Sequence, residues 1–194
     1  GSLAKGTALR SLNDIDVACY ISGADAPKDV AALLQYLAER LRKAYPNFSP
    51  DQVKPKTYCV TVSFRGTGLD VDVVPILYNG DPEWRGNLVS QDDGSFLETS
   101  VPLHLDFTRK RKEAQETHFA QTVRLIKCWT QKVKRENQDF RLKSFMIEMI
   151  LAHLSDRGLK FSDYPEALQH FFTYIATTTL RQRIVFEDYY KSSQ

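Results

Sequence analysis

Three segments of the chain alternate between apolar and polar residues, and acidic residues occupy polar positions in two of them. From Asp14 to Ile21 every second residue is apolar, and Asp14 and Asp16 lie between the apolar positions. Successive side chains of a β-strand point to opposite faces, so this period of two predicts a strand with one buried face. The same alternation recurs in residues 58–64 and, after a Gly-containing turn, in residues 69–74. The pattern therefore predicts three strands, the last two joined as a hairpin.

Apolar residues at helical spacing dominate the rest of the chain. One amphipathic helix is predicted to begin at Asp25 or Pro27 and to run to Leu41. Further helices are predicted over residues 119–133, 144–154 and 165–178. Pro75 is expected to end the strand that begins at Leu69, and residues 78–106 are expected to form loops. Strands in the first half and helices in the second predict an α/β (α+β) fold with two parts, 1–106 and 107–194.

The composition adds few constraints beyond a globular chain. Of its 194 residues, 42% are hydrophobic and 26% are charged, which excludes collagen-like, disulfide-scaffold and disordered classes. No apolar run approaches the roughly 18 residues that a membrane helix needs, so no membrane partner is expected. The three cysteines form no C-x-x-C pair, which favours a reducing compartment and a cytoplasmic location.

The charge is unevenly distributed along the chain. Residues 1–108 carry 10 Lys and Arg against 14 Asp and Glu, a balance of −4. Residues 109–143 carry 11 against 4, a balance of +7, and residues 144–194 carry 5 against 6. An acidic first part and a basic middle suit an enzyme that binds metal and phosphate. The same basic run is also typical of a solvated helix face, so charge alone leaves both interpretations open.

The paired acidic residues are the first candidates for chemistry. Asp14 and Asp16 project from one face of the predicted strand, about 7 Å apart along the chain. Asp72 lies on a later strand with the same division into an acidic and an apolar face, and Asp70 on that strand is the alternative candidate for the third metal ligand. If the strands pair, three carboxylates converge, and such oxygen ligands suit Mg²⁺. A single D-x-D is also common on ordinary exposed strands.

A polar, glycine-containing segment precedes the acidic strand. It begins with Gly1 and Ser2 and continues to Gly6 and Thr7. Glycine permits close backbone approach, and a serine hydroxyl with backbone N–H groups can bind phosphate oxygens. Taken alone, this segment also fits an ordinary loop.

In combination these motifs resemble those of the polymerase-β-like nucleotidyltransferases. The order is Gly-Ser, an interval, Asp14-Ile15-Asp16, and then an acidic strand. The strings Gly-Ser-x-x-x-Gly-Thr-x-Leu-Arg and Asp72-Val73-Val74-Pro75 are similar to those of oligoadenylate synthases and of the bacterial cGAS/DncV-like nucleotidyltransferases, the CD-NTases. Two helical segments, 123–129 and 142–148, resemble that family's phosphate-binding region. The resemblance covers residues 1 to about 150.

The resemblance implies a site and its ligands. The family's fold is a mixed sheet bearing an acidic triad, followed by a helical lobe, with the active site in the cleft between them. The metal ligands would be Asp14, Asp16 and Asp72, holding two Mg²⁺ ions, with Mn²⁺ as an alternative. The residues for the triphosphate of ATP or another NTP would be Gly1, Ser2, Lys127 and Ser144. Lys143 and Phe145 are weaker candidates; Lys127 could instead be a solvated surface lysine and Phe145 a core residue.

The implied activity is the joining of NTPs, ATP above all, into a cyclic di- or trinucleotide that signals in bacterial anti-phage defence (CBASS). Implied partners are a HORMA-type regulator or a nucleic-acid activator that binds the 109–143 basic region. The family's long N-terminal helix has no counterpart here, so further residues are expected before Gly1. Two other functions remain open: a linear-product nucleotidyltransferase acting on an oligoadenylate, RNA or small-molecule acceptor, and a non-catalytic nucleic-acid-binding module.

Overall fold

The chain folds into two compact units in the computed structural model. The residues that the structure describes are 2–9, 14–22, 24, 26–27, 30–90, 93–178, 181 and 184. Unit 1 comprises Gly1 and Ser11–Pro102, and unit 2 comprises Ser2–Arg10 and Leu103–Gln194. The short segment before the acidic strand therefore belongs with the second half of the chain. In this respect the units differ from the ranges 1–106 and 107–194, which remain a proposal about functional domains.

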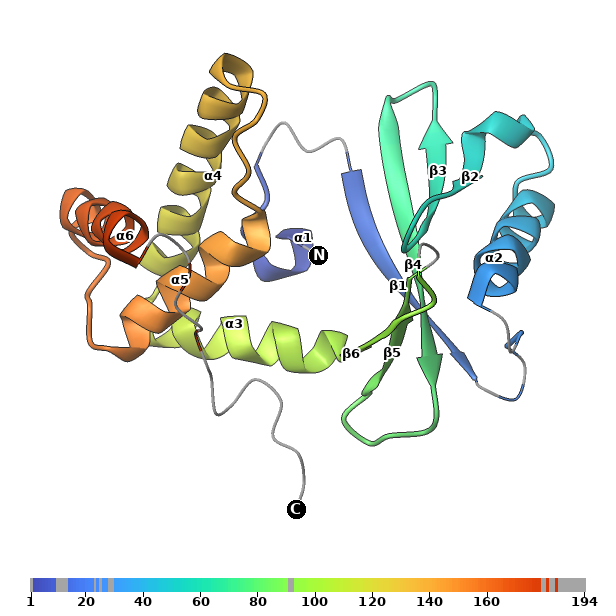
Figure 1. Ribbon diagram of the computed structural model, residues 1–194, viewed down its shortest axis with the longest axis horizontal. Coiled ribbons are helices and arrows are strands. Elements are labelled where there is room, and N and C mark those ends of the chain that lie inside the picture. The colour runs from blue at the N-terminus through green and yellow to red at the C-terminus, as the bar shows by residue number, and fades with distance from the viewer. Residues whose placement is uncertain are drawn as a thin grey trace. The chain divides into compact units, whose positions relative to one another are not determined.

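Unit 1 is built on a mixed β-sheet. Its strands are β1 (Asp14–Ser22), β2 (Val53–Pro55), β3 (Val60–Phe64), β4 (Leu69–Tyr78), β5 (Gly86–Val89) and β6 (Phe96–Thr99). The order β2-β3-β4-β5-β6 is antiparallel throughout, and β1 pairs with β4 in parallel. As Figure 1 shows, β4 runs through the middle of this unit. The predicted hairpin of β3 and β4 is confirmed, with a turn at residues 65–68.

One helix covers one face of the sheet. Helix α2 (Val30–Ala44) packs its buried side chains against apolar residues of β3 and β4, and a short 3-10 helix, η1 (Pro50–Gln52), precedes β2. The buried residues of this core are Leu34, Leu37, Ala38, Val53, Val60, Val62 and Val73. Because side chains alternate along a strand, Asp16 of β1 and Asp70 and Asp72 of β4 lie on the opposite face. The apolar face of β1 is only partly buried, since Val17 is 42% exposed.

Two predictions about this unit are wrong. Pro75 does not end its strand, because β4 continues to Tyr78. Pairing with β3 ends at Val73 and pairing with β5 begins at Ile76, so Pro75 lies between these two ladders, while on the other edge of β4 it is the Cα partner of Cys19 in β1. Residues 78–106 are not all loop, since they hold β5, β6 and the start of α3. Strands of four residues are too short to display an alternation, so periodicity missed them.

Unit 2 is a helical unit with its own core. It contains α1 (Ser2–Lys5), most of α3 (Val101–Gln115), α4 (His118–Glu136), α5 (Ser144–Asp156) and α6 (Tyr164–Thr178). The helices predicted over 144–154 and 165–178 are confirmed as α5 and α6. Phe107, Phe119, Phe161 and Phe171 are among the largest side chains of the core. None of the described helices is long and apolar enough to cross a lipid bilayer.

Part of the basic run is structural. Arg111 of α3 is buried, donates to both carboxylate oxygens of Asp156 and stacks on the ring of Phe107. A buried guanidinium needs such partners because it loses its hydration. The interpretation of residues 109–143 as a wholly solvated face is therefore wrong at Arg111, and the site below includes further exceptions.

Candidate functional site

The acidic residues of β1 and β4 lie in register on neighbouring strands. Asp16 is the Cα partner of Asp72, and Asp14 is the Cα partner of Asp70. Paired residues of parallel strands share a face, so the backbone directs Asp16, Asp70 and Asp72 to the side of the sheet opposite α2. Asp16 is exposed, and Asp70 and Asp72 are partly exposed. The side chain of Asp14 lies outside the described residues.

Asp72 is the most firmly held of these carboxylates. Its antiparallel partner Thr61 donates a short hydrogen bond to Oδ1, and Lys56 Nζ lies 3.4 Å from the same oxygen. Thr61 is buried whereas Lys56 is largely exposed. Burial, and secondly the negative charge of Asp72, raise the pKa of the Cys59 thiol, so this cysteine stays protonated beside the carboxylate.

These residues suit a divalent cation. Carboxylate oxygens are hard donors, and two carboxylates facing each other on paired strands repel unless a cation lies between them. Among the side chains that the structure describes, no group of three or more His, Cys, Asp or Glu is gathered as a metal cluster. The third predicted ligand, Asp14, is not among those side chains. Asp16 and Asp72 therefore fit the predicted metal, and Asp14 adds a carboxylate in the same strand.

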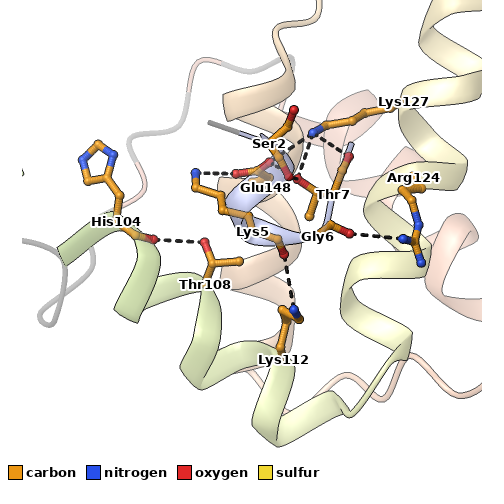
Figure 2. A network of polar contacts seen from close by, with 10 residues as sticks. All are labelled: Ser2, Lys5, Gly6, Thr7, His104, Thr108, Lys112, Arg124, Lys127 and Glu148. Carbon is orange, nitrogen blue, oxygen red and sulfur yellow. Dashed lines mark hydrogen bonds and ion pairs between the residues drawn. The ribbon is translucent and has the colours of Figure 1, made fainter. Parts of the chain in front are cut away.

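Unit 2 holds the segment that contains Ser2. After α1 the chain turns at Gly6, whose φ of +69° favours glycine, and Thr7 is fully buried. The backbone of the segment is bound by two basic side chains of the helices (Figure 2). Lys112 Nζ donates to Lys5 O at 3.3 Å, and Arg124 Nη1 donates to Gly6 O at 3.2 Å. Gly1 lies outside the described residues.

A buried network joins this segment to α4 and α5. Lys127 Nζ lies 3.1 Å from each of Thr7 O, Thr7 Oγ1 and Glu148 Oε1. Thr7 Oγ1 donates to Glu148 Oε1 at 2.9 Å, and Lys5 Nζ donates to Glu148 Oε2 at 2.8 Å. We call Lys5, Thr7, Lys127 and Glu148 the lysine–glutamate network. The interpretation of Lys127 as a solvated surface lysine is wrong, since its side chain is 7% exposed.

The electrostatics of the network keep Glu148 ionised. Burial raises the pKa of this carboxyl. The charge and hydrogen bond of Lys5, the charge of Lys127 and the hydrogen bond of Thr7 together lower the pKa by more than burial raises it, so it lies below the usual value. Sequence reasoning assigned no role to Lys5 or Glu148. A glutamate within the apolar run Phe145–Leu151 was a signal, because a helix face otherwise destined for the core rarely carries a lone acid.

The remaining predicted residues lie near the start of α5. Ser144 is its first residue and Lys143 precedes it, and both are exposed. Phe145 is 46% exposed, with its ring centroid 6.3 Å from that of His104, so its interpretation as a core residue is wrong. Burial, and secondly the charge of Lys5, lower the pKa of His104 to about 4, so His104 is neutral at pH 7.

Within each unit, then, some predicted residues come together. Unit 1 pairs Asp16 with Asp72, and unit 2 brings Lys127 to the segment that contains Ser2. No protein-family model matches the chain. A cyclic AMP-AMP-AMP synthase of Escherichia coli strain MS 115-1 is 70% identical over all 194 residues, which cover 60% of that protein.

Solved structures agree with this likeness. A structure of E. coli MS115-1 CdnC with ATP matches with a TM-score of 0.87 and 70% identity, over 100% of this chain and 61% of that one. This chain belongs to the bacterial CD-NTase family. A complex of E. coli MS115-1 CdnC with HORMA-deltaN matches with a TM-score of 0.85 and 70% identity, over 97% of this chain and 58% of that CD-NTase. The chain spans about three fifths of the length of these CD-NTases.

Proposed function

We propose that the protein is a metal-dependent nucleotidyltransferase that joins ATP into a cyclic oligonucleotide for bacterial anti-phage signalling. The observation that carries the proposal is the register of Asp16 with Asp72, which opposes two carboxylates on neighbouring strands, with Asp14 at the start of one of them. The name of the 70% identical relative supports a ring of three AMP units as the product.

The proposed chemistry assigns the acidic residues to metal binding. Asp14, Asp16 and Asp72 would hold Mg²⁺, with Mn²⁺ as an alternative. When bound, two such ions supply the positive charge that favours the ionised attacking hydroxyl and the leaving pyrophosphate. A ribose hydroxyl of the acceptor attacks the α-phosphorus of the donor, and pyrophosphate leaves. The same step repeats to extend the chain. In the last step the free hydroxyl of the chain attacks the α-phosphorus of the chain's own triphosphate, pyrophosphate leaves and the ring closes.

The triphosphate of the donor is assigned to Gly1, Ser2, Lys127 and Ser144. Ser2 begins α1 in the segment that three basic side chains contact, and one of them, Lys127, is bonded through Nζ to Thr7 of that segment. Ser144 is exposed at the first position of α5. Backbone N–H groups and cationic side chains are the groups that bind phosphate.

A HORMA-type regulator is the favoured protein partner, supported by the CdnC complex with HORMA-deltaN. A nucleic-acid activator at residues 109–143 is less favoured, because several cations of this region bind within the protein. Arg111 and Lys127 are buried, and Lys112 and Arg124 contact backbone carbonyls. The proposed substrate, ATP, and the three free cysteines suit a cytoplasmic location.

Incubation of the full-length protein with each α-labelled NTP tests the activity directly. With Mg²⁺ and ATP we expect a labelled product that survives phosphatase and has the mass of three linked AMP units. A product degraded from its ends would instead establish a linear nucleotidyltransferase. The HORMA-type regulator and duplex DNA or RNA are added separately, and no product under any of these conditions would contradict the proposal.

Two aspartates on one strand provide a matched control for the metal assignment. Asp72→Asn removes the charge that opposes Asp16 and should abolish product formation. Asp70→Asn makes the same chemical change two residues away on the same face and should retain most of the activity. If Asp70→Asn is the inactive variant and Asp72→Asn is active, Asp70 is the third ligand instead.

A further inference from the structure

Lys5 is placed beside the residue assigned to the donor's phosphates. It ends the single turn of α1 that Ser2 begins, and residues three apart in a helical turn lie on the same side. Its ammonium group is fixed by a 2.8 Å bond to Glu148 Oε2, and its side chain is only 11% exposed. The structure thus holds a partly buried positive charge on the same turn as Ser2.

The two lysines of the network differ in how many of their N–H donors already have an acceptor in the described part of the protein. An ammonium group has three N–H donors. Those of Lys127 are matched by three acceptors, Thr7 O, Thr7 Oγ1 and Glu148 Oε1. Within the described residues Lys5 Nζ meets one acceptor, Glu148 Oε2. The ammonium group of Lys5 is partly shielded from water and has N–H groups without a protein acceptor among the described residues, so these groups are suited to an incoming anion.

The charges around the segment also favour an anion. Lys5, Lys112, Arg124 and Lys127 all contact the segment or lie within it, whereas Glu148 is the acidic side chain that contacts them in the described part of the chain. Four positive charges against one negative charge leave an excess of three. Such an excess in a partly buried site destabilises the protein through repulsion and is relieved by a polyanion.

We propose that Lys5 is a further residue that binds the triphosphate of the donor nucleotide, and that Glu148 is the positioning residue that holds it there. Glu148 acts through Lys5: its Oε2 fixes the ammonium group, while its Oε1 binds Lys127 and Thr7 and so keeps the segment in place. This inference rests on the proposed function, because it assigns Lys5 to the same nucleotide as Ser2.

Inorganic tripolyphosphate is the probe, because it carries the phosphates without base, ribose or reaction. Its dissociation constant is measured by calorimetry on the full-length protein and on three variants. Lys5→Gln removes the charge and should weaken binding roughly 10- to 100-fold, the usual effect of losing one charged hydrogen bond. Lys5→Arg keeps the charge and should bind within a few-fold of the wild type. Lys160→Gln changes an exposed lysine of the same unit and should bind like the wild type.

Glu148 is tested by a second pair of measurements. Glu148→Gln leaves Lys5 without its anionic partner, so tripolyphosphate affinity and the KM for ATP should both change, while adenosine binding stays the same. A residue that only supported the fold would lower the melting temperature without this separation between tripolyphosphate and adenosine. Equal tripolyphosphate affinity for Lys5→Gln and the wild type would overturn the proposal.

A footprint of the wild type covers the case in which the variants fail to fold. Acetylation of Lys5 by acetic anhydride, followed by mass spectrometry, should slow when tripolyphosphate is present, whereas acetylation of Lys160 should not. An unchanged rate at Lys5 would contradict the inference. The tripolyphosphate, adenosine and acetylation readouts do not require catalysis, so tripolyphosphate binding through Lys5 without any cyclic product would refute the proposed function and leave the binding assignment intact.

Discussion

Thr61 donates a hydrogen bond to Oδ1 of Asp72 across the antiparallel pair of β3 and β4. The bond engages one carboxylate oxygen and restricts rotation of the side chain, so the other oxygen of Asp72 has a defined direction on the acidic face. Groups that orient a ligand in this way influence metal binding without touching the metal.

Replacement of Thr61 by valine tests this arrangement. Thr61→Val keeps the branched shape that suits a strand and removes the hydroxyl, so the fold should survive while Asp72 loses its orientation. We expect the rate of product formation to fall by about 10- to 100-fold, with a higher metal concentration needed for half-maximal rate. Thr61→Ser retains the hydroxyl and should restore most of the rate. An unimpaired Thr61→Val enzyme would contradict the role of Thr61.

The buried ion pair between Lys127 and Glu148 should make their mutational effects interdependent. Lys127→Met leaves Glu148 with Lys5 as its remaining cationic partner, and breaking a buried pair costs about 3–5 kcal/mol in unfolding free energy. Glu148→Gln should also destabilise the protein. The double variant should lose less than the sum of the single losses, by roughly 1–3 kcal/mol, as urea unfolding would measure. Additive losses within about 0.5 kcal/mol would argue against direct coupling.

The protein should become less stable as the pH decreases, because His104 has a lowered pKa in the folded state. The folded pKa of about 4 lies below the ordinary histidine pKa of 6.5, so the unfolded state binds this proton more readily. The stabilising contribution is therefore complete above pH 6.5 and decreases as the pH falls from 6.5 to about 4. Urea unfolding at several pH values should reveal this slope, which is at most about 1.4 kcal/mol per pH unit for one group.

Variants at two histidines test whether His104 causes this pH dependence of stability. His104→Gln should flatten the pH dependence between 6.5 and 4, because glutamine does not titrate. His170→Gln is the control, since its side chain is 52% exposed on α6. An unchanged slope in His104→Gln would exclude His104 as its source.

Gly86 should not tolerate a side chain. A Cβ at this position would lie 2.5 Å from both Leu77 O and Ile76 Cγ2, and the carbonyl belongs to the paired backbone of β4. Gly86→Ala should therefore destabilise unit 1 by about 1–3 kcal/mol, measured by thermal or urea unfolding. Gly66→Ala is the matched control, because a Cβ at this position would have no atom within 4 Å other than those of its chain neighbours, and it should change stability by less than about 0.5 kcal/mol.

Periodicity predicted the elements that bury one continuous face. β3 is evident from alternation, and α5 and α6 from helical spacing, because each buries apolar residues on one side. β1 is also evident from alternation, although its apolar face is only partly buried. β5 and β6 were missed because four residues display too little pattern, and β6 is largely exposed. The extension of β4 past Pro75 depended on which neighbour pairs at each residue, which no local pattern records.

The candidate site was predictable to a similar extent. Asp16 and Asp72 were identified because acidic residues alternate with apolar ones on two strands, and alternation assigns each residue a face. Lys127 was selected through a family resemblance, but its burial was not foreseen, because a lysine beside an apolar stripe can point either to water or inward. Nothing in the local sequence indicated that Thr61 would face Asp72, since their opposition is set by the register of β3 with β4.

By itself, the sequence determined the acidic faces of two strands, the helical character of the second half and the residue types that suit metal and phosphate. Only the tertiary structure decided that the Ser2 segment belongs with helices more than 100 residues away. Thr7 and Glu148, 141 residues apart, meet because a buried carboxylate must find donors wherever the fold supplies them. Local patterns record which face of an element is apolar, whereas the partner of a buried charge is chosen by packing across the whole chain.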